Sequence, residues 1–207
     1  MADTMIGNEG ALAPNSRTLM ESDVTTELGA RVSTPQLAIW GLVATATMLF
    51  AGFASAYLVR REGTDWQPVP LPHILWLNSI LLLASSATVE CARAAWGKGR
   101  FRATVQWARA STVLGALFLV GQLAAWKQLA AQGVYLPTNP YSSFFYVLTA
   151  LHGVHLIGGI AGLSYLLWRV SLAQRRPLNA GVLDGCVTYW HFVDGVWVFL
   201  YLLLLFY

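Results

Sequence analysis

Long apolar stretches dominate the chain after residue 34, and short polar stretches separate them. The first runs without a charged residue from Arg31 to Arg60, which is long enough for a helix to cross the roughly 30 Å hydrocarbon core of a bilayer. Within a bilayer, backbone polar groups must bond internally, so such stretches are expected to be helical. The pattern therefore predicts an all-α integral membrane protein, a bundle of five transmembrane helices at about residues 35–59, 72–95, 106–130, 141–169 and 186–206.

Proline residues mark several of the predicted helix starts. Pro35 and Pro72 stand at the beginning of the first two apolar stretches, where proline suits the first turn of a helix. Pro140 precedes the fourth. The third has only 17 uncharged residues, between Arg109 and Lys127, but both flanking cations can snorkel and lengthen the span.

The chain divides into two parts at the first apolar stretch. Residues 1–34 contain several acidic side chains and no apolar core of a signal peptide. We expect them to form a polar, disordered cytoplasmic tail. Residues 35–207 form the predicted transmembrane domain.

Composition agrees with the membrane class. Hydrophobic residues make up 56% of the chain and charged residues 11%, against about 25% charged in ordinary soluble proteins. The net charge of +3 does not indicate a nucleic-acid partner, because the basic residues lie between apolar stretches. The 2 cysteines, Cys91 and Cys186, provide neither a disulfide framework nor a CxxC metal motif.

The distribution of lysine and arginine predicts the orientation, because these residues accumulate in cytoplasmic loops. One side would carry Arg60, Arg61 and Lys127. We therefore expect a cytoplasmic N-terminus and a C-terminus on the outside, since the other side carries ten such residues: Arg17, Arg31, Arg93, Lys98, Arg100, Arg102, Arg109, Arg169, Arg175 and Arg176.

The last apolar stretch contains an unusual polar pair within the string YWHFVDGVW. His191 and Asp194 are its only acidic, basic or imidazole side chains. An aspartate facing lipid costs at least about 2.5–3.5 kcal/mol, so such groups normally turn toward protein partners. Their i, i+3 spacing places both on one helix face, at a depth where they could meet Glu90 of the second helix. The pair could be structural or could collect protons, and Glu90 could pack beside Arg93 or conduct protons.

The fourth predicted helix contains His152 and His155. Together with His191 they could form a metal or haem site, since imidazoles on facing helices are common ligands. Alternatively, the imidazoles satisfy interhelical hydrogen bonds. Their predicted depth differs from that of His191 by roughly 8 to 14 Å, which favours hydrogen bonding over axial haem ligation.

Several strings closely resemble subunit III of the haem–copper terminal oxidases, in its short five-helix bacterial form. FFYVLTALHGVHLIGG (Phe144–Gly159) and YWHFVDGVWVFLY (Tyr189–Tyr201) are similar to the last two helices of that family. MLFAGFASAY (Met48–Tyr57), LNSILLLASSAT (Leu77–Thr88) and Leu114–Gln122 are similar to the three preceding helices.

The resemblance implies a non-catalytic subunit of a cytochrome c oxidase. In this family, haem and copper belong to partner subunits. Subunit III packs on catalytic subunit I, binds phospholipid, and supports proton uptake and stability during dioxygen reduction coupled to proton pumping. By position, His152, His155, His191 and Asp194 match the polar membrane residues of the family and are not metal ligands. The resemblance thus assigns this chain no catalytic residue and no cofactor of its own, subunits I and II as partners, and a bacterial inner-membrane location.

The chain departs from the family pattern at two carboxylates. Ala46 occupies a position where the family often has glutamate, and the sequence Gln122 to Trp126 has Ala125 where an acid is common. Glu90 lies where the family is not expected to have a carboxylate. That Glu90 takes the role of either missing carboxylate is therefore a hypothesis.

The same residues are also compatible with other functions. The closest is subunit III of a quinol oxidase, or an accessory relative in a nitric oxide reductase system. A small b-type cytochrome would use His152 or His155 with His191, and a small transporter would need a polar path across both leaflets.

Overall fold

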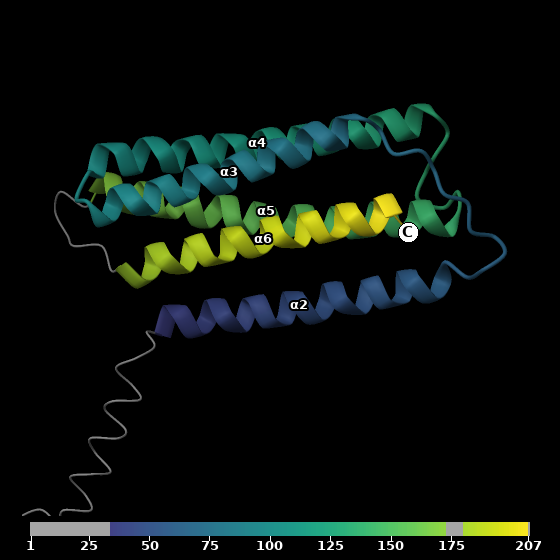
Figure 1. Ribbon diagram of the computed structural model, residues 1–207, viewed down its shortest axis with the longest axis horizontal. Coiled ribbons are helices and arrows are strands. Elements are labelled where there is room, and N and C mark those ends of the chain that lie inside the picture. The colour runs from purple at the N-terminus through teal and green to yellow at the C-terminus, as the bar shows by residue number, and fades with distance from the viewer. Residues whose placement is uncertain (1–33, 173–179, 207) are drawn as a thin grey trace, which may run out of the picture.

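The computed structural model describes residues 34–172 and 180–206, and this part of the chain is all-helical. Its five helices are long and apolar enough to cross a membrane, which confirms the predicted fold class. They run side by side along one direction (Figure 1). The helices are α2 (Thr34–Arg60), α3 (Ile74–Gly97), α4 (Phe101–Ala131), α5 (Pro140–Leu172) and α6 (Ala180–Phe206).

Two helices begin well before the expected positions. The structure starts α4 at Phe101 rather than 106 and α6 at Ala180 rather than 186. The expected boundaries followed the onset of the apolar run, but a helix can continue past the membrane surface through polar residues. The predicted tail, residues 1–34, lies outside the described residues apart from Thr34, so its disorder stays a prediction.

The turn between α3 and α4 explains why these helices form a close antiparallel pair. Gly99 has φ +67°, a left-handed conformation that glycine adopts without penalty. Its N–H bonds the carbonyl of Trp96 at 2.9 Å, and the N–H of Arg100 bonds that of Ala95 at 2.9 Å. These bonds close the end of α3 and reverse the chain within the three residues between Gly97 and Phe101. We call the end of the bundle that holds this turn the basic end.

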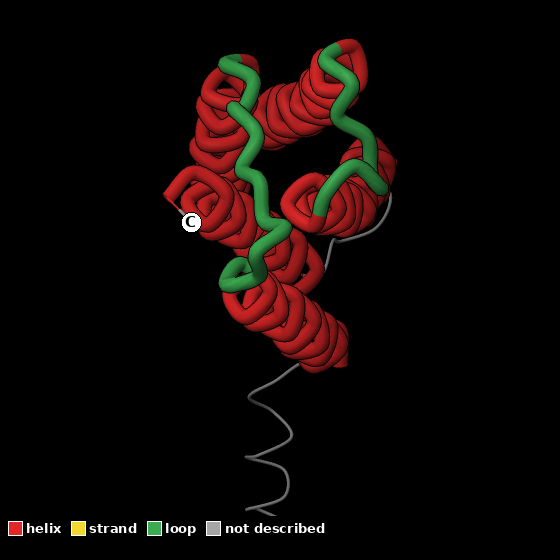
Figure 2. Tube along the Cα trace, turned by 90° about the vertical axis from the view of Figure 1, so that its right-hand side faces the viewer, coloured by secondary structure: helices red, strands yellow, loops and turns green. Residues whose placement is uncertain are grey.

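Helix α6 holds the bundle together. Its backbone lies beside α2, α3 and α5, and its tryptophan side chains reach α4, whereas the backbone of α2 lies beside only α5 and α6 among the described helices. The end view in Figure 2 shows α2 at the edge, away from the α3–α4 pair. Much of the outer surface consists of large apolar side chains such as Met48, Val120 and Val154, which suit contact with lipid tails.

Two buried tryptophans of α6 attach it to α3. The indole N–H of Trp190 donates to Ser85 at 3.0 Å, and that of Trp197 donates to Ser79 at 3.0 Å. Interhelical hydrogen bonds in membranes average about 0.6 kcal/mol each. The rings also fill the core, and Trp190 fits only because Gly115 of α4 has no side chain: a Cβ there would lie 2.7 Å from Cη2 of the ring.

The loop after α2 is folded back on the bundle. Trp66 meets the ring of Tyr57 edge-on at 5.0 Å and that of Tyr141 at 5.6 Å, which joins α2 to α5. Arg60 donates two hydrogen bonds to Asp65, one of them at 2.7 Å. This contact lowers the pKa of the Asp65 carboxyl.

The tight fit at Gly115 generates a testable prediction. Gly115→Ala should lower the free energy of unfolding by about 1–3 kcal/mol, because the new methyl group overpacks against Trp190. Unfolding of the detergent-solubilised chain by dodecyl sulfate, followed by tryptophan fluorescence, would measure it.

Gly52→Ala is the matched control, because nothing lies within 4 Å of a Cβ at this position of α2. Both variants gain the same helix propensity, so their difference isolates the packing effect. Equal stability of the two variants would contradict the packing described here.

Candidate functional site

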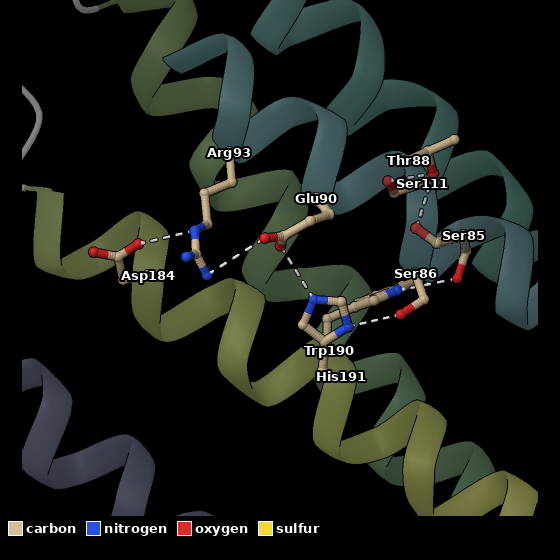
Figure 3. A network of polar contacts seen from close by, with 9 residues as sticks. All are labelled: Ser85, Ser86, Thr88, Glu90, Arg93, Ser111, Asp184, Trp190 and His191. Carbon is tan, nitrogen blue, oxygen red and sulfur yellow. Dashed lines mark hydrogen bonds and ion pairs between the residues drawn. The ribbon is translucent and has the colours of Figure 1, made fainter. Parts of the chain in front are cut away.

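Facing sides of α3 and α6 place His191 between two polar residues. Ser86 and Glu90 lie four residues apart on α3 and therefore on one face of it. The Nε2 atom of His191 lies 3.3 Å from Oε2 of Glu90, and its Nδ1 atom lies 2.6 Å from Oγ of Ser86 (Figure 3). Both ring nitrogens are thus engaged, one by a carboxylate and the other by a hydroxyl.

Charged residues extend this contact toward the basic end. Nη1 of Arg93 lies 3.7 Å from Oε1 of Glu90, and its Nε atom lies 3.8 Å from Oδ1 of Asp184 on α6. Figure 3 shows the resulting order Asp184, Arg93, Glu90, His191, Ser86. We call these five residues the polar face. Its charged side chains are about half exposed in the isolated chain, so each ion pair contributes little stability.

Asp194 lies one turn further along α6 and is only 4% exposed. Neither carboxyl oxygen has a hydrogen-bond partner among the described residues. The hydroxyl of Ser86 interacts with the carboxyl group, without reaching hydrogen-bond geometry. The structure therefore brings Glu90 and His191 together and leaves Asp194 beside Ser86 without a hydrogen bond to it.

The other two histidines lie elsewhere. His152 is completely buried between the rings of Phe118, at 5.6 Å, and Trp197, at 5.1 Å, and neither of its nitrogens has a partner among the described residues. His155 bonds through Nδ1 to the carbonyl of Leu151 at 2.8 Å. The candidate ligands His152, His155 and His191 therefore point into three different surroundings and are not brought together.

The expectation that the histidines form interhelical hydrogen bonds agrees with the structure for only one of the three. His191 makes the interhelical contacts that were expected, and His155 bonds within its own helix. His152 makes neither kind of bond within the described structure.

Sequence reasoning missed Ser86 and Asp184. Serine is common in membrane helices, so Ser86 attracted no attention, although its spacing from Glu90 marks it as a neighbour on α3. The predicted start at 186 is too late and places Asp184 outside the last helix, whereas α6 begins at Ala180. Extending that helix by two turns would have placed Asp184 on the side of His191, seven residues away.

Comparison with known proteins shows what the chain is similar to. The family model described as cytochrome c oxidase subunit III matches residues 34–207. A probable cytochrome c oxidase subunit 3 of Nocardia farcinica is 33% identical over 79% of this chain and 82% of the relative. The cytochrome c oxidase subunit 3 of Synechocystis is 30% identical over 93% of this chain and 87% of the relative. The probable subunit 3 of Mycobacterium tuberculosis is 30% identical over 81% and 84%, respectively.

The ion pairs of the polar face generate the second prediction. Arg93→Glu would place a third acid beside Glu90 and Asp184, and we expect it to reduce the free energy of unfolding by about 0.5–1 kcal/mol. The double variant Arg93→Glu with Asp184→Arg should recover most of this loss, because it restores opposite charges across α3 and α6. Dodecyl sulfate unfolding at low salt would measure both.

Arg100→Glu is the control, since the side chain of Arg100 makes none of the ion pairs in the described structure. Failure of the charge swap to recover stability beyond the single variant would show that Arg93 and Asp184 do not interact.

Proposed function

The chain belongs to the cytochrome c oxidase subunit III family, and we propose that it is the non-catalytic subunit III of a respiratory haem–copper oxidase. It is a multi-pass membrane protein of the respiratory chain, part of an oxidase complex with other subunits. In the proposal, haem and copper belong to partner subunits, and this chain packs on the flank of catalytic subunit I. The electron donor is cytochrome c, as the names of the relatives state for those proteins.

The exposed polar face is the observation that supports packing on another subunit. Ser86 lies 11 residues before the end of α3 at Gly97, or about 16 Å along the helix. At this depth, polar side chains facing lipid tails are costly, and such groups normally face protein or a water-filled space. The side chain of His191 is nevertheless 40% exposed and that of Glu90 50% exposed in the isolated chain. A partner subunit that covers the polar face removes this cost.

A groove between α2 and α5 supports the proposed binding of phospholipid. It has a volume of about 690 Å³ and lies at the end opposite the basic end. Apolar walls suit an acyl chain, and the guanidinium of Arg60 in the lining, although bonded to Asp65, supplies a positive charge for a phosphate group. The lining residues are Ala56, Val59, Arg60, Gly63, Pro140, Ser143 and Phe144.

The proposed location is the inner membrane of a bacterium. The relatives named above are bacterial proteins. The basic end carries Lys98, Arg100 and Arg102 at the α3–α4 turn, so the excess of positive charge supports a cytoplasmic position for this end. The polar face would then open toward the cytoplasm, the side from which an oxidase takes its protons.

Purification from the native membrane tests this function. A tagged chain extracted in mild detergent should carry with it a subunit that contains haem and copper, and the absorption spectrum should show these haems. The spectrum should vanish once the tagged chain is stripped from its partners, because the proposal assigns it no redox centre. The partner's haems and its electron donor would also separate a cytochrome c oxidase from a quinol oxidase.

A haem spectrum retained by the stripped chain would contradict the proposal, since it would make the membrane histidines ligands. Purification of the folded chain without any oxidase subunit, under conditions that leave the oxidase active, would contradict it as well.

A further inference from the structure

Asp194 is a buried acid that the packing of the bundle does not explain. It is 4% exposed, and neither oxygen has a hydrogen-bond partner in the described part of the chain. An ionised carboxylate in such surroundings costs several kcal/mol unless it is paired. Asparagine or leucine would fill the same space without this cost. An acid at this position therefore indicates that its proton is used.

Among the described residues, no nearby cation neutralises Asp194. On α3, Arg93 is engaged by Glu90 and Asp184. On α5, His152 lies against Trp197, and His155 bonds its own helix. The only titratable side chains of α2 are Tyr57 and Arg60, which lie at its far end.

A series of proton-carrying groups joins Asp194 to Glu90 on the polar face. Ser86 interacts with its carboxyl group and lies 2.6 Å from Nδ1 of His191. The other nitrogen of His191 lies 3.3 Å from Glu90, whose side chain is half exposed. An imidazole engaged at both nitrogens can accept a proton at one and release a proton from the other. Hydroxyl groups donate and accept as well.

We propose that Asp194 is an internal proton-exchange site, filled and emptied through Ser86, His191 and Glu90. In filling, the Glu90 carboxyl gives its proton to Nε2 of His191. His191 gives the proton on Nδ1 to Ser86, and Ser86 gives its hydroxyl proton to the ionised Asp194. A small rotation of the Ser86 side chain completes the contact with the carboxyl group. The net change moves one proton from Glu90 to Asp194, and water reprotonates Glu90. Emptying reverses each step.

The role of this exchange in the oxidase rests on the proposed function, because a local reserve of protons supports proton uptake only if the chain is part of an oxidase. The exchange itself is a property of this chain. It can therefore be measured without turnover, and it can fail while the assignment to an oxidase stands.

Infrared spectroscopy of the assembled complex tests the proposal. This chain would be labelled with 13C at the aspartate carboxyl carbon and assembled with unlabelled partner subunits. The C=O band of a protonated, labelled carboxyl group should appear and should be absent in Asp194→Asn. After transfer to heavy water, its shift reports proton exchange. We expect Ser86→Ala to slow the exchange at least tenfold, because it removes the hydroxyl next to Asp194.

Two further variants separate the relay from general effects on packing. Glu90→Gln should also slow the exchange, since it removes the proton donor at the surface. Ser79→Ala is the matched control: it likewise removes a serine of α3 that bonds a side chain of α6, Trp197, but this serine lies outside the relay. The exchange rate of this variant should equal that of the unmodified chain.

Three results would overturn the proposal. One is the absence of a protonated carboxyl band from labelled aspartate, which would mean that Asp194 is ionised. The second is a band that does not shift in heavy water. The third is equal exchange in Ser86→Ala and Ser79→Ala. If Asp194→Asn fails to assemble, the labelled band still points to Asp194, because the other described aspartates, Asp65 and Asp184, are more than half exposed and each is paired with an arginine.

Discussion

The need to pair polar groups inside a membrane is the constraint on which this structure depends. Lipid tails offer no hydrogen bonds, so each polar side chain of a spanning helix must find a partner on another helix or on its own backbone. Helix α6 meets this need mainly on α3, where Ser79, Ser85 and Ser86 bond Trp197, Trp190 and His191 in turn. These contacts fix the register of the two helices, and the register in turn sets Glu90 opposite His191.

Two departures from the burial and pairing of polar groups bear on the proposed function. The polar face satisfies its own hydrogen bonds but exposes them at a depth where lipid would surround an isolated chain. Asp194 is buried and unpaired in the described structure. The exposure of the polar face supports a protein partner, and the unpaired carboxyl group of Asp194 supports a role in proton exchange. Both lie on the same two helices, so a subunit that covers the polar face would also lie beside the entrance to Asp194.

The sequence predicts the helices better than it predicts their contacts. Apolar runs between charges identify all five spans, because membrane crossing imposes a minimum length and little else. Helix ends are not set by the apolar runs alone: α6 continues past the charged Asp184 to Ala180, and this extension carries Asp184 to Arg93. Depth along the helices was enough to suggest that Glu90 and His191 could meet. Depth alone does not show which face of each helix points toward its neighbour, so it does not identify Ser86 as a contact of His191. For the same reason, the separation of His152 from the polar face follows only from the difference in depth.

In the proposed complex, the polar face of α3 and α6 lies against the catalytic subunit. An electron cryo-microscopy map of the complete oxidase in lipid nanodiscs tests this most directly, because it shows what surrounds Ser86, Glu90 and His191. We predict that density for subunit I, or for ordered water between the two subunits, covers these side chains. Density for lipid should cover apolar positions such as Val154 of α5. Lipid tails directly against His191 and Glu90, with subunit I bound to another face, would contradict the account.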